Sequence, residues 1–227
     1  MRIHELDDVT IRKIAAGEVA ERPASAVKEL VENALDAEAT RIEVAVERGG
    51  KDRISVADNG DGMTGSEVEL AVREHTTSKI DDDEDLDRIA TLGFRGEALH
   101  AIGAVSQMSI TTRTPDADAA TRLRVEHGEI AAIEPAGRAP GTTVEVTELF
   151  GETPARRKFL REDATEFDQI NRIVSRYALA NPSVAVSLTH DGHETFSTSG
   201  HGDLKGAVLA VYGREVAESM ITVEADR

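Results

Sequence analysis

The sequence predicts an α+β fold, a two-layer sandwich in which helices cover one face of a mixed, mostly antiparallel sheet. Two observations lead to this class. Segments with apolar residues at helical spacing and segments with alternating apolar residues both occur along the chain. They follow the order helices, paired strands and helices, without the regular strand–helix alternation that is typical of parallel sheets.

The expected helices each rest on a local signal. Pro23 suits the first turn of a helix that ends near Asp36. One side of that helix, which should face the core, carries Val27, Leu30, Val31, Ala34 and Leu35. Ser66 and Glu69 have the spacing of a capping box, which starts a helix that reaches about Glu74. Further helices are expected at about 9–20, 96–105 and 165–180, with a short one inside the polar segment 75–95.

The expected strands show apolar residues at every second position. The first two cover about 42–46 and 54–56, with Gly49 and Gly50 at the turn between them. The others are expected at about 108–113, 121–126, 130–134, 143–147, 184–189 and 194–197.

The domain organisation follows from composition. After the stretch SGHGD, residues 199–203, the composition loosens, and a new helix and a new strand begin. We therefore expect a main domain over residues 1–200, followed by a linker and the start of an incomplete second domain over 201–227.

Composition also narrows the class of protein. Apolar residues make up 40% of the chain and aromatic residues only 3%, so alanine and aliphatic side chains must build the core. No apolar run approaches the roughly 20 residues of a membrane span, and the first residues lack the apolar middle of a signal peptide. We therefore expect a cytoplasmic protein with no membrane partner. The absence of cysteine excludes disulfides and thiolate metal sites.

The formal net charge of −17 argues, at first sight, against binding to nucleic acid. However, acidic residues are spread along the whole chain, and arginine outnumbers lysine 20 to 6. This pattern indicates adaptation to high salt, in which carboxylates keep the surface hydrated. The net charge is therefore no argument against DNA as a partner.

The stretch KELVENALDA, residues 28–37, places Glu29, Asn33 and Asp36 on the polar side of the second helix. This is also the pattern of an ordinary solvated helix face. In a functional site, Glu29 and Asn33 would present a carboxylate and an amide oxygen, one turn apart, to one small volume. A carboxylate there suits a general base that orients water, and the amide oxygen suits a Mg²⁺ ligand.

The stretch ADNGDGM, residues 57–63, contains Asn59-Gly60, a strong hairpin-turn signal. In a calcium loop that starts at Asp58, the third position needs an oxygen ligand, but here this position is Gly60. A calcium loop is therefore excluded. Nothing strand-like follows before the next helix, which argues against a plain hairpin. The stretch instead indicates a strand end that releases Asp58 into a glycine-lined gap. An ionised Asp58 only accepts hydrogen bonds, which suits the exocyclic amine of adenine, and Gly60 and Gly62 would let the ligand approach the backbone.

Two further stretches, HTTSKI at 75–80 and TLGFRGEALHAIGAV at 91–105, combine glycines, hydroxyls and cations before a helix. Backbone N–H groups at a helix start bind anions, so these stretches suit phosphate groups. The chain contains no Walker motif, GxxxxGK[ST]. Each stretch alone is also typical of a tight turn.

In combination these blocks are specific. The order IAAGEV, KELVENALDA, DNGDGM, TTSK, GFRGEAL, GTTVEV and TPARRKFL closely resembles the N-terminal ATPase region of MutL-type DNA mismatch repair proteins. The resemblance covers residues 3 to about 189. More broadly, three of the blocks resemble the ATP site of the GHKL superfamily, which DNA gyrase, Hsp90 and histidine kinases share. The resemblance implies the Bergerat ATP-binding fold and, as cofactors, ATP and Mg²⁺.

The resemblance also implies a role for each matching residue. Glu29 matches the general base that activates water, Asn33 the Mg²⁺ ligand, and Asp58 the residue that binds the adenine amine. Gly60, Gly62 and Met63 match the segment beneath the base. Thr143 matches a threonine that assists Asp58 through water. The lid segments that wrap the phosphates match Thr77, Ser78, Lys79, Gly93, Phe94, Arg95, Gly96, Glu97, Ala98 and Leu99.

The block TPARRKFL has the cations of a nucleic-acid patch, but a structural explanation is preferred. Pro154 should open a helix that Phe159 and Leu160 pack against the core, with the arginines in solvent.

The function implied by the resemblance is an ATP-driven switch of mismatch repair. ATP would order the lid and favour homodimerisation, and the switch would couple a mismatch-recognition protein of the MutS type to downstream repair factors. DNA would be a partner of the full-length protein. In the family a lysine of the second domain reaches the γ-phosphate, and we expect that element to lie beyond Arg227.

We therefore expect ATP binding to be more robust than hydrolysis in these 227 residues, with weak or absent turnover, and DNA binding to be weaker still. Two alternatives stay open. One is a nucleotide-binding module without turnover. The other is a different GHKL enzyme, such as a topoisomerase subunit, an Hsp90-like protein or a histidine kinase, although the block IAAGEV argues against it.

Overall fold

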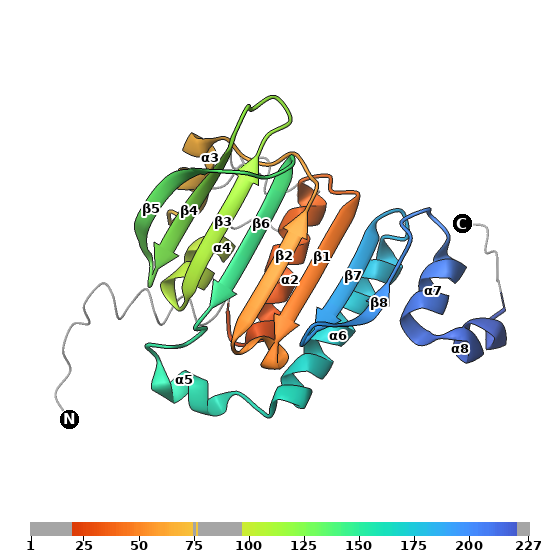
Figure 1. The fold of residues 1–227 in the computed structure, drawn as a ribbon. Helices are drawn as coiled ribbons and strands as arrows, with labels where there is room; N and C mark the ends of the chain where they lie inside the picture. The colour runs from red at the N-terminus through yellow and green to blue at the C-terminus, as the bar shows by residue number, and fades with distance from the viewer. Residues whose placement is uncertain (1–19, 75, 77–96, 222–227) are drawn as a thin grey trace, which may run out of the picture.

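The computed structural model describes residues 20–74, 76 and 97–221. Within them, eight strands form one sheet in the order β5-β4-β3-β6-β2-β1-β7-β8 (Figure 1). Only β1 and β7 pair in parallel, and every other neighbouring pair is antiparallel. The strands are β1 (Arg41–Glu47), β2 (Arg53–Asp58), β3 (Gln107–Arg113), β4 (Ala120–Glu126), β5 (Glu129–Ala136), β6 (Gly141–Thr147), β7 (Ala185–His190) and β8 (His193–Ser197).

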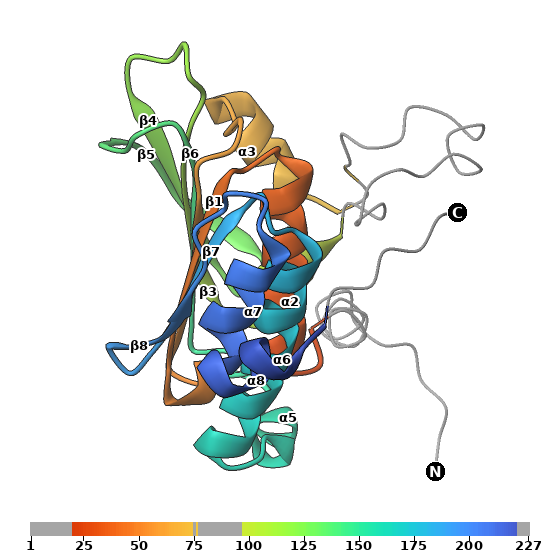
Figure 2. The same cartoon turned by 90° about the vertical axis from the view of Figure 1, so that its right-hand side faces the viewer.

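Helices cover one face of this sheet, as Figure 2 shows with the sheet seen edge-on. The described helices are α2 (Pro23–Asp36), α3 (Gly65–Ala71), α4 (Ala98–Ala104), α5 (Pro154–Phe159), α6 (Asp163–Ala180), α7 (Leu204–Tyr212) and α8 (Arg214–Ser219), and a 3₁₀ turn, η1 (Arg48–Gly50), joins β1 to β2. The predicted α+β sandwich with a mixed, mostly antiparallel sheet is therefore confirmed.

The core lies between the sheet and the pair α2 and α6, which pack against each other. In β1 the apolar residues Ile42, Val44 and Val46 are buried, while the residues between them are exposed or half-buried. The same alternation places Val144 and Val146 of β6 in the core. The side of α2 predicted to face the core does so: Leu30 and Val31 are buried against the sheet.

Two local predictions are wrong. The capping box of α3 is formed by Thr64 and Glu67 rather than by Ser66 and Glu69. The Thr64 backbone is extended, so its hydroxyl accepts from the Glu67 N–H while the Glu67 carboxylate accepts from the Thr64 N–H at 2.7 Å. Glu69 instead pairs with Arg73 one turn later.

The second wrong prediction concerns α5. Pro154 does open this helix, as predicted, but Phe159 is 83% exposed and does not pack against the core. The helix has only six residues and none of them is buried. The chain turns to an extended conformation at Leu160, and this is the side chain that reaches the core.

The expected helix at 9–20 and the short helix within 75–95 fall on residues outside the described part of the chain, apart from single positions. Among the described residues, no helix has the length and apolar character needed to cross a membrane.

Candidate functional site

The polar side of α2 carries a chain of paired charges. Lys28 Nζ lies 3.1 Å from Glu29 Oε1 and 2.8 Å from Glu32 Oε2. Glu32 is almost fully buried and also accepts a hydrogen bond from the Tyr177 hydroxyl on α6. Burial opposes the charge of Lys28, but its bonds to Glu32 and Glu29 outweigh burial and raise its pKa. Glu29, a quarter exposed, is thus held at the helix surface by an adjacent cation.

The Tyr177 hydroxyl keeps its proton in this arrangement. Burial, followed by the hydrogen bond to the Glu32 carboxylate, raises the pKa of Tyr177 well above its ordinary value. Tyr177 therefore acts as a fixed donor that orients Glu32, and Glu32 in turn orients Lys28.

Asp58 ends β2 on the side of the sheet that the helices cover. Its Oδ1 accepts from the Gly60 N–H at 2.9 Å and from the Thr142 N–H at 3.2 Å. Burial raises the pKa of the Asp58 carboxyl, and these two bonds and the nearby Arg138 guanidinium partly counter that rise. Among the described residues, Oδ2 receives no hydrogen bond, so one carboxylate oxygen is available to a ligand.

The two glycines after Asp58 allow close backbone contacts. A Cβ at Gly60 would lie 2.4 Å from the Ala37 carbonyl oxygen, at the end of α2. Gly62 has a φ of +68°, and a Cβ there would lie 2.1 Å from the Arg113 carbonyl oxygen. Any side chain at either position would push the loop away, so the loop needs glycine for its own packing.

The same loop is attached to α2. The Asp61 N–H donates to the Ala37 carbonyl, and the Ala37 N–H donates to the Asn33 carbonyl one turn earlier in the chain. Glu29 lies one further turn back, about 12 Å from Ala37 along the axis at about 1.5 Å per residue. Asp58, next to the C-terminal end of α2, is therefore followed by Asn33 and then Glu29 in the direction of the helix axis. This order suits an extended ligand with adenine at one end and phosphates at the other.

A threonine pair supports the Asp58 end. Thr112 accepts from the Met63 N–H at 2.8 Å, and its hydroxyl lies 3.0 Å from that of Thr142. Met63 therefore joins the site through its backbone, while its side chain packs on the core. Sequence reasoning missed Thr112 and Thr142.

Thr143 is not the threonine beside Asp58. Strand residues alternate between faces, and Thr142 shares its face with Asp58, so the Thr143 side chain lies on the opposite face. There it accepts from Arg138 Nε at 2.9 Å. The sequence already contained the signal that Thr142 faces the core. Thr142 lies two and four positions before Val144 and Val146, which are buried, so all three side chains share one face of the strand.

The remaining predicted residues belong to the lid segments. Thr77, Ser78, Lys79, Gly93, Phe94, Arg95 and Gly96 lie outside the described residues. Glu97 precedes the first turn of α4, which contains Ala98 and Leu99, and α4 contacts α2. The predicted roles of these residues stay predictions.

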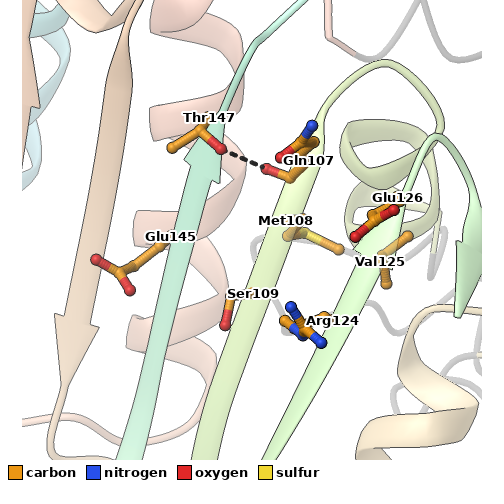
Figure 3. A pocket seen from close by; sticks show the side chains of 8 residues that line it. All are labelled: Gln107, Met108, Ser109, Arg124, Val125, Glu126, Glu145 and Thr147. Atoms are coloured by element: carbon orange, nitrogen blue, oxygen red, sulfur yellow. Dashed lines mark hydrogen bonds between the residues drawn. The ribbon is translucent and has the colours of Figure 1, made fainter. Parts of the chain in front are cut away.

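A hollow of about 190 Å³ lies elsewhere, on the sheet face away from the helices (Figure 3). It is lined by Gln107, Met108, Ser109, Arg124, Val125, Glu126, Glu145 and Thr147. Gln107 and Thr147 pair at the end of the sheet opposite to Asp58, because Thr147 also pairs with Arg53 at the start of β2. The hollow is therefore separate from the candidate site.

The donor set of α2 fits Mg²⁺ bound to phosphates. Mg²⁺ in nucleotide sites takes one or two protein oxygens, with the rest from phosphate and water. Asn33 offers one such oxygen on the half-buried side of α2, and Glu29 lies one turn away. Bound Mg²⁺ would neutralise phosphate charge, and Asn33 would hold it.

Comparison with known proteins identifies the family of the chain. The model of the family described as "Histidine kinase-, DNA gyrase B-, and HSP90-like ATPase" matches residues 21–146, more than half of the chain. The chain belongs to this ATPase family. The match includes Glu29, Asn33, Asp58 and two threonines of β6, Thr142 and Thr143.

Within the family, the chain is of the MutL type. It is 62% identical over 226 residues to the DNA mismatch repair protein MutL of Halobacterium salinarum and 51% identical over 223 residues to that of Symbiobacterium thermophilum. These matches cover 99% and 98% of this chain, but it spans only about a third of the length of either relative, 34% and 35%. The likeness to a Halobacterium protein supports the salt-adapted origin expected from the charge.

Solved structures show the same relationship. The Aquifex aeolicus MutL ATPase domain complexed with ADP matches with a TM-score of 0.68 and 34% identity, over 86% of this chain and 70% of that one. The N-terminal domain of a DNA repair protein matches with a TM-score of 0.79 and 31% identity, over 92% of this chain and 62% of that one. The MutL-type ATPase fold is therefore shared across most of the chain.

Proposed function

We propose that this MutL-type region binds ATP with Mg²⁺ and hydrolyses it. The observation that carries the proposal is the Asp58 carboxylate, which two backbone donors fix at the end of β2 with one oxygen left available among the described residues. A fixed acceptor beside glycine backbone suits the adenine amine. The ADP complex of the Aquifex relative supports a nucleotide as the ligand class.

In this proposal Glu29 is the general base and Asn33 the protein ligand of Mg²⁺. Glu29 would accept a proton from the water that attacks the γ-phosphate, and Lys28 would keep the carboxylate oriented until substrate arrives. The lid residues of 77–79 and 93–99 would surround the phosphates.

We further propose that nucleotide binding drives dimerisation of two copies of this region. The cycle would couple mismatch recognition by a MutS-type protein to later repair factors, and the whole protein would also bind DNA in the cytoplasm. The names of the curated relatives, which are DNA mismatch repair proteins, support this placement.

The proposed ATPase domain covers residues 1–200, and the proposed linker and start of a second domain cover 201–227. The end of the sheet at Ser197 supports the boundary. Contacts of α7 with α6 and β8 attach the first part of the linker to the ATPase domain.

The test is a titration of the 227-residue chain with ATP and with a non-hydrolysable ATP analogue, each with and without Mg²⁺, in high salt. Calorimetry gives affinity, phosphate release gives turnover, and sedimentation gives the oligomeric state. We expect Mg²⁺-dependent binding, slow turnover, and dimers with the analogue. Binding without turnover, also in a form extended past Arg227, would instead favour the nucleotide-binding module. Failure to bind either nucleotide would contradict the proposal.

A further inference from the structure

Arg138 lies in the connection between β5 and β6. Because β5 is the edge strand and β6 is a central strand, this connection passes over the ends of β4 and β3 (Figure 1). The connection leads into β6, which pairs with β3 on one side and β2 on the other and begins directly beside Asp58. The position of the nucleotide site therefore depends on how this connection is secured.

The Arg138 side chain secures it with four hydrogen bonds. Nη2 donates to the Asp58 carbonyl at 2.7 Å and to the Thr142 carbonyl at 2.6 Å. Nε donates to the Thr143 hydroxyl at 2.9 Å, and Nη1 donates to the Ala139 carbonyl at 3.0 Å. One planar guanidinium thus joins the last residue of β2 to the first residues of β6 and to their connection.

Gly141 allows the start of β6 to lie very close to the end of β2 at this junction. Its φ is +116°, and a Cβ there would lie 2.3 Å from the Asp58 carbonyl oxygen and 2.9 Å from Arg138 Nη1. The backbone of β6 therefore contacts the Asp58 backbone directly, and the guanidinium packs over the contact. This geometry brings the Thr142 N–H to 3.2 Å from the Asp58 carboxylate.

The positive charge of Arg138 also supports the Asp58 carboxylate as an acceptor. The half-buried guanidinium lies close enough to Asp58 to favour the ionised carboxylate, which lowers its pKa against the effect of burial. Burial lowers the pKa of Arg138 itself, and the negative charges of Asp58 and Glu43 oppose that change.

We propose that Arg138 is a positioning residue of the nucleotide site, which holds the start of β6 against the end of β2 so that Asp58 and Thr142 face the base together. The proposal rests on the proposed adenine site. Arg138 does not touch the nucleotide, because its bonds lie at the backbone of Asp58 and on the face of β6 that carries Thr143. Its effect should appear as discrimination between bases rather than as general affinity for triphosphate.

The test compares ATP with inosine triphosphate, which carries a carbonyl oxygen in place of the exocyclic amine. The parent chain should prefer ATP, because an ionised Asp58 accepts from the amine and repels the carbonyl. In Arg138→Met, which keeps length but removes charge and donors, we expect the ratio of the two affinities to fall by about 2- to 10-fold, the equivalent of one net hydrogen bond. The affinity for inosine triphosphate should change little.

Arg138→Lys separates the bonding geometry from the charge. Lysine keeps the charge but lacks the planar fork that joins two strands, so we expect it to lose most of the discrimination as well. The matched control is Arg122→Met. Arg122 also donates to a threonine hydroxyl, that of Thr111, at 3.2 Å, but it joins β4 to β3, and its loss should leave the ratio unchanged.

All variants are measured below their thermal unfolding transitions, so that loss of fold is not counted as loss of binding. Arg138→Met or Arg138→Lys with the parent ratio would overturn the inference, as would an equal fall in Arg122→Met. The variant Asp58→Asn tests separately whether the proposed adenine assignment is correct. If the parent chain does not discriminate, or if Asp58→Asn discriminates as the parent does, the adenine assignment fails and the inference fails with it.

Discussion

The two ends of the candidate site are built differently. At the end of β2, main-chain N–H groups of Gly60 and Thr142 hold the Asp58 carboxylate, and Arg138 joins the strands behind it. On α2, the Glu29 carboxylate is held by Lys28, a long flexible side chain that is itself 43% exposed on its side-chain surface.

The difference suits the two proposed tasks. A group that selects a base must stay in one place, and backbone donors on paired strands provide that at no cost in side-chain entropy. A general base must exchange partners when water and phosphate arrive, and a surface ion pair is weak enough to be replaced. Each of the following predictions breaks one end of the site and leaves the other intact.

The largest effect is expected at the α2 end. Glu29→Ala should lower the ATP turnover rate by about 10²- to 10⁴-fold, because it removes the general base. ATP affinity should hold or rise, since a carboxylate near the phosphates is lost. Phosphate release and calorimetry measure the two quantities, best also in a form that extends past Arg227. Glu69→Ala, which removes another helix carboxylate paired with a cation, is the control. Parent-level turnover in Glu29→Ala would reduce Glu29 to a surface residue.

The next largest effect concerns the loop after β2. Gly62→Ala should destabilise the fold by about 1–2 kcal/mol for the left-handed backbone and by about 1–3 kcal/mol more for the clash with the Arg113 carbonyl. Gly192→Ala is the matched control, because Gly192 has a φ of +78° but, among the described residues, only its chain neighbours have atoms within 4 Å of a new Cβ. Urea unfolding measures both. Equal destabilisation would mean that the loop relaxes without cost.

A smaller effect, confined to binding, is expected for Asp58→Asn. The amide directs its NH₂ toward the adenine amine and loses the charged acceptor, which costs about 1.5–3 kcal/mol, or roughly 10- to 150-fold in ATP affinity. Calorimetry in high salt measures the change. An unchanged ATP affinity would contradict the assignment of the adenine position to this end of the site.

The smallest effect is on stability. The pKa of Asp58 is raised by burial, so the folded state binds its proton more readily than the unfolded state, and ionisation destabilises the fold as pH rises above the ordinary value of 3.8. Asp58→Asn should therefore be at least as stable as the parent at pH 7, and its advantage should shrink as pH falls toward 4. Urea unfolding at both values checks this; an advantage that grows in acid would contradict it.

Much of the fold was predictable because its signals are local. Helical spacing on α2 and alternation in β1 and β6 assign buried faces from neighbours along the chain, and these assignments agree with the structure. The sequence blocks also placed the chain in its family. The alternation of Val144 and Val146 also indicated that Thr142 shares the face of Asp58, although the motif alone suggested Thr143.

By itself, then, the sequence determined the fold class, most of the described helices and strands, the family and the candidate carboxylates, because periodicity and short motifs depend only on residues close in the chain. Only the tertiary structure decided that Thr142 meets Asp58, that Arg138 joins β2 to β6, and that Phe159 stays exposed. These outcomes depend on the strand order, in which β6 lies next to β2 although 82 residues lie between Asp58, the end of β2, and Gly141, the start of β6. Strand order is set by which long-range pairing buries the most apolar surface, and no local pattern contains that information.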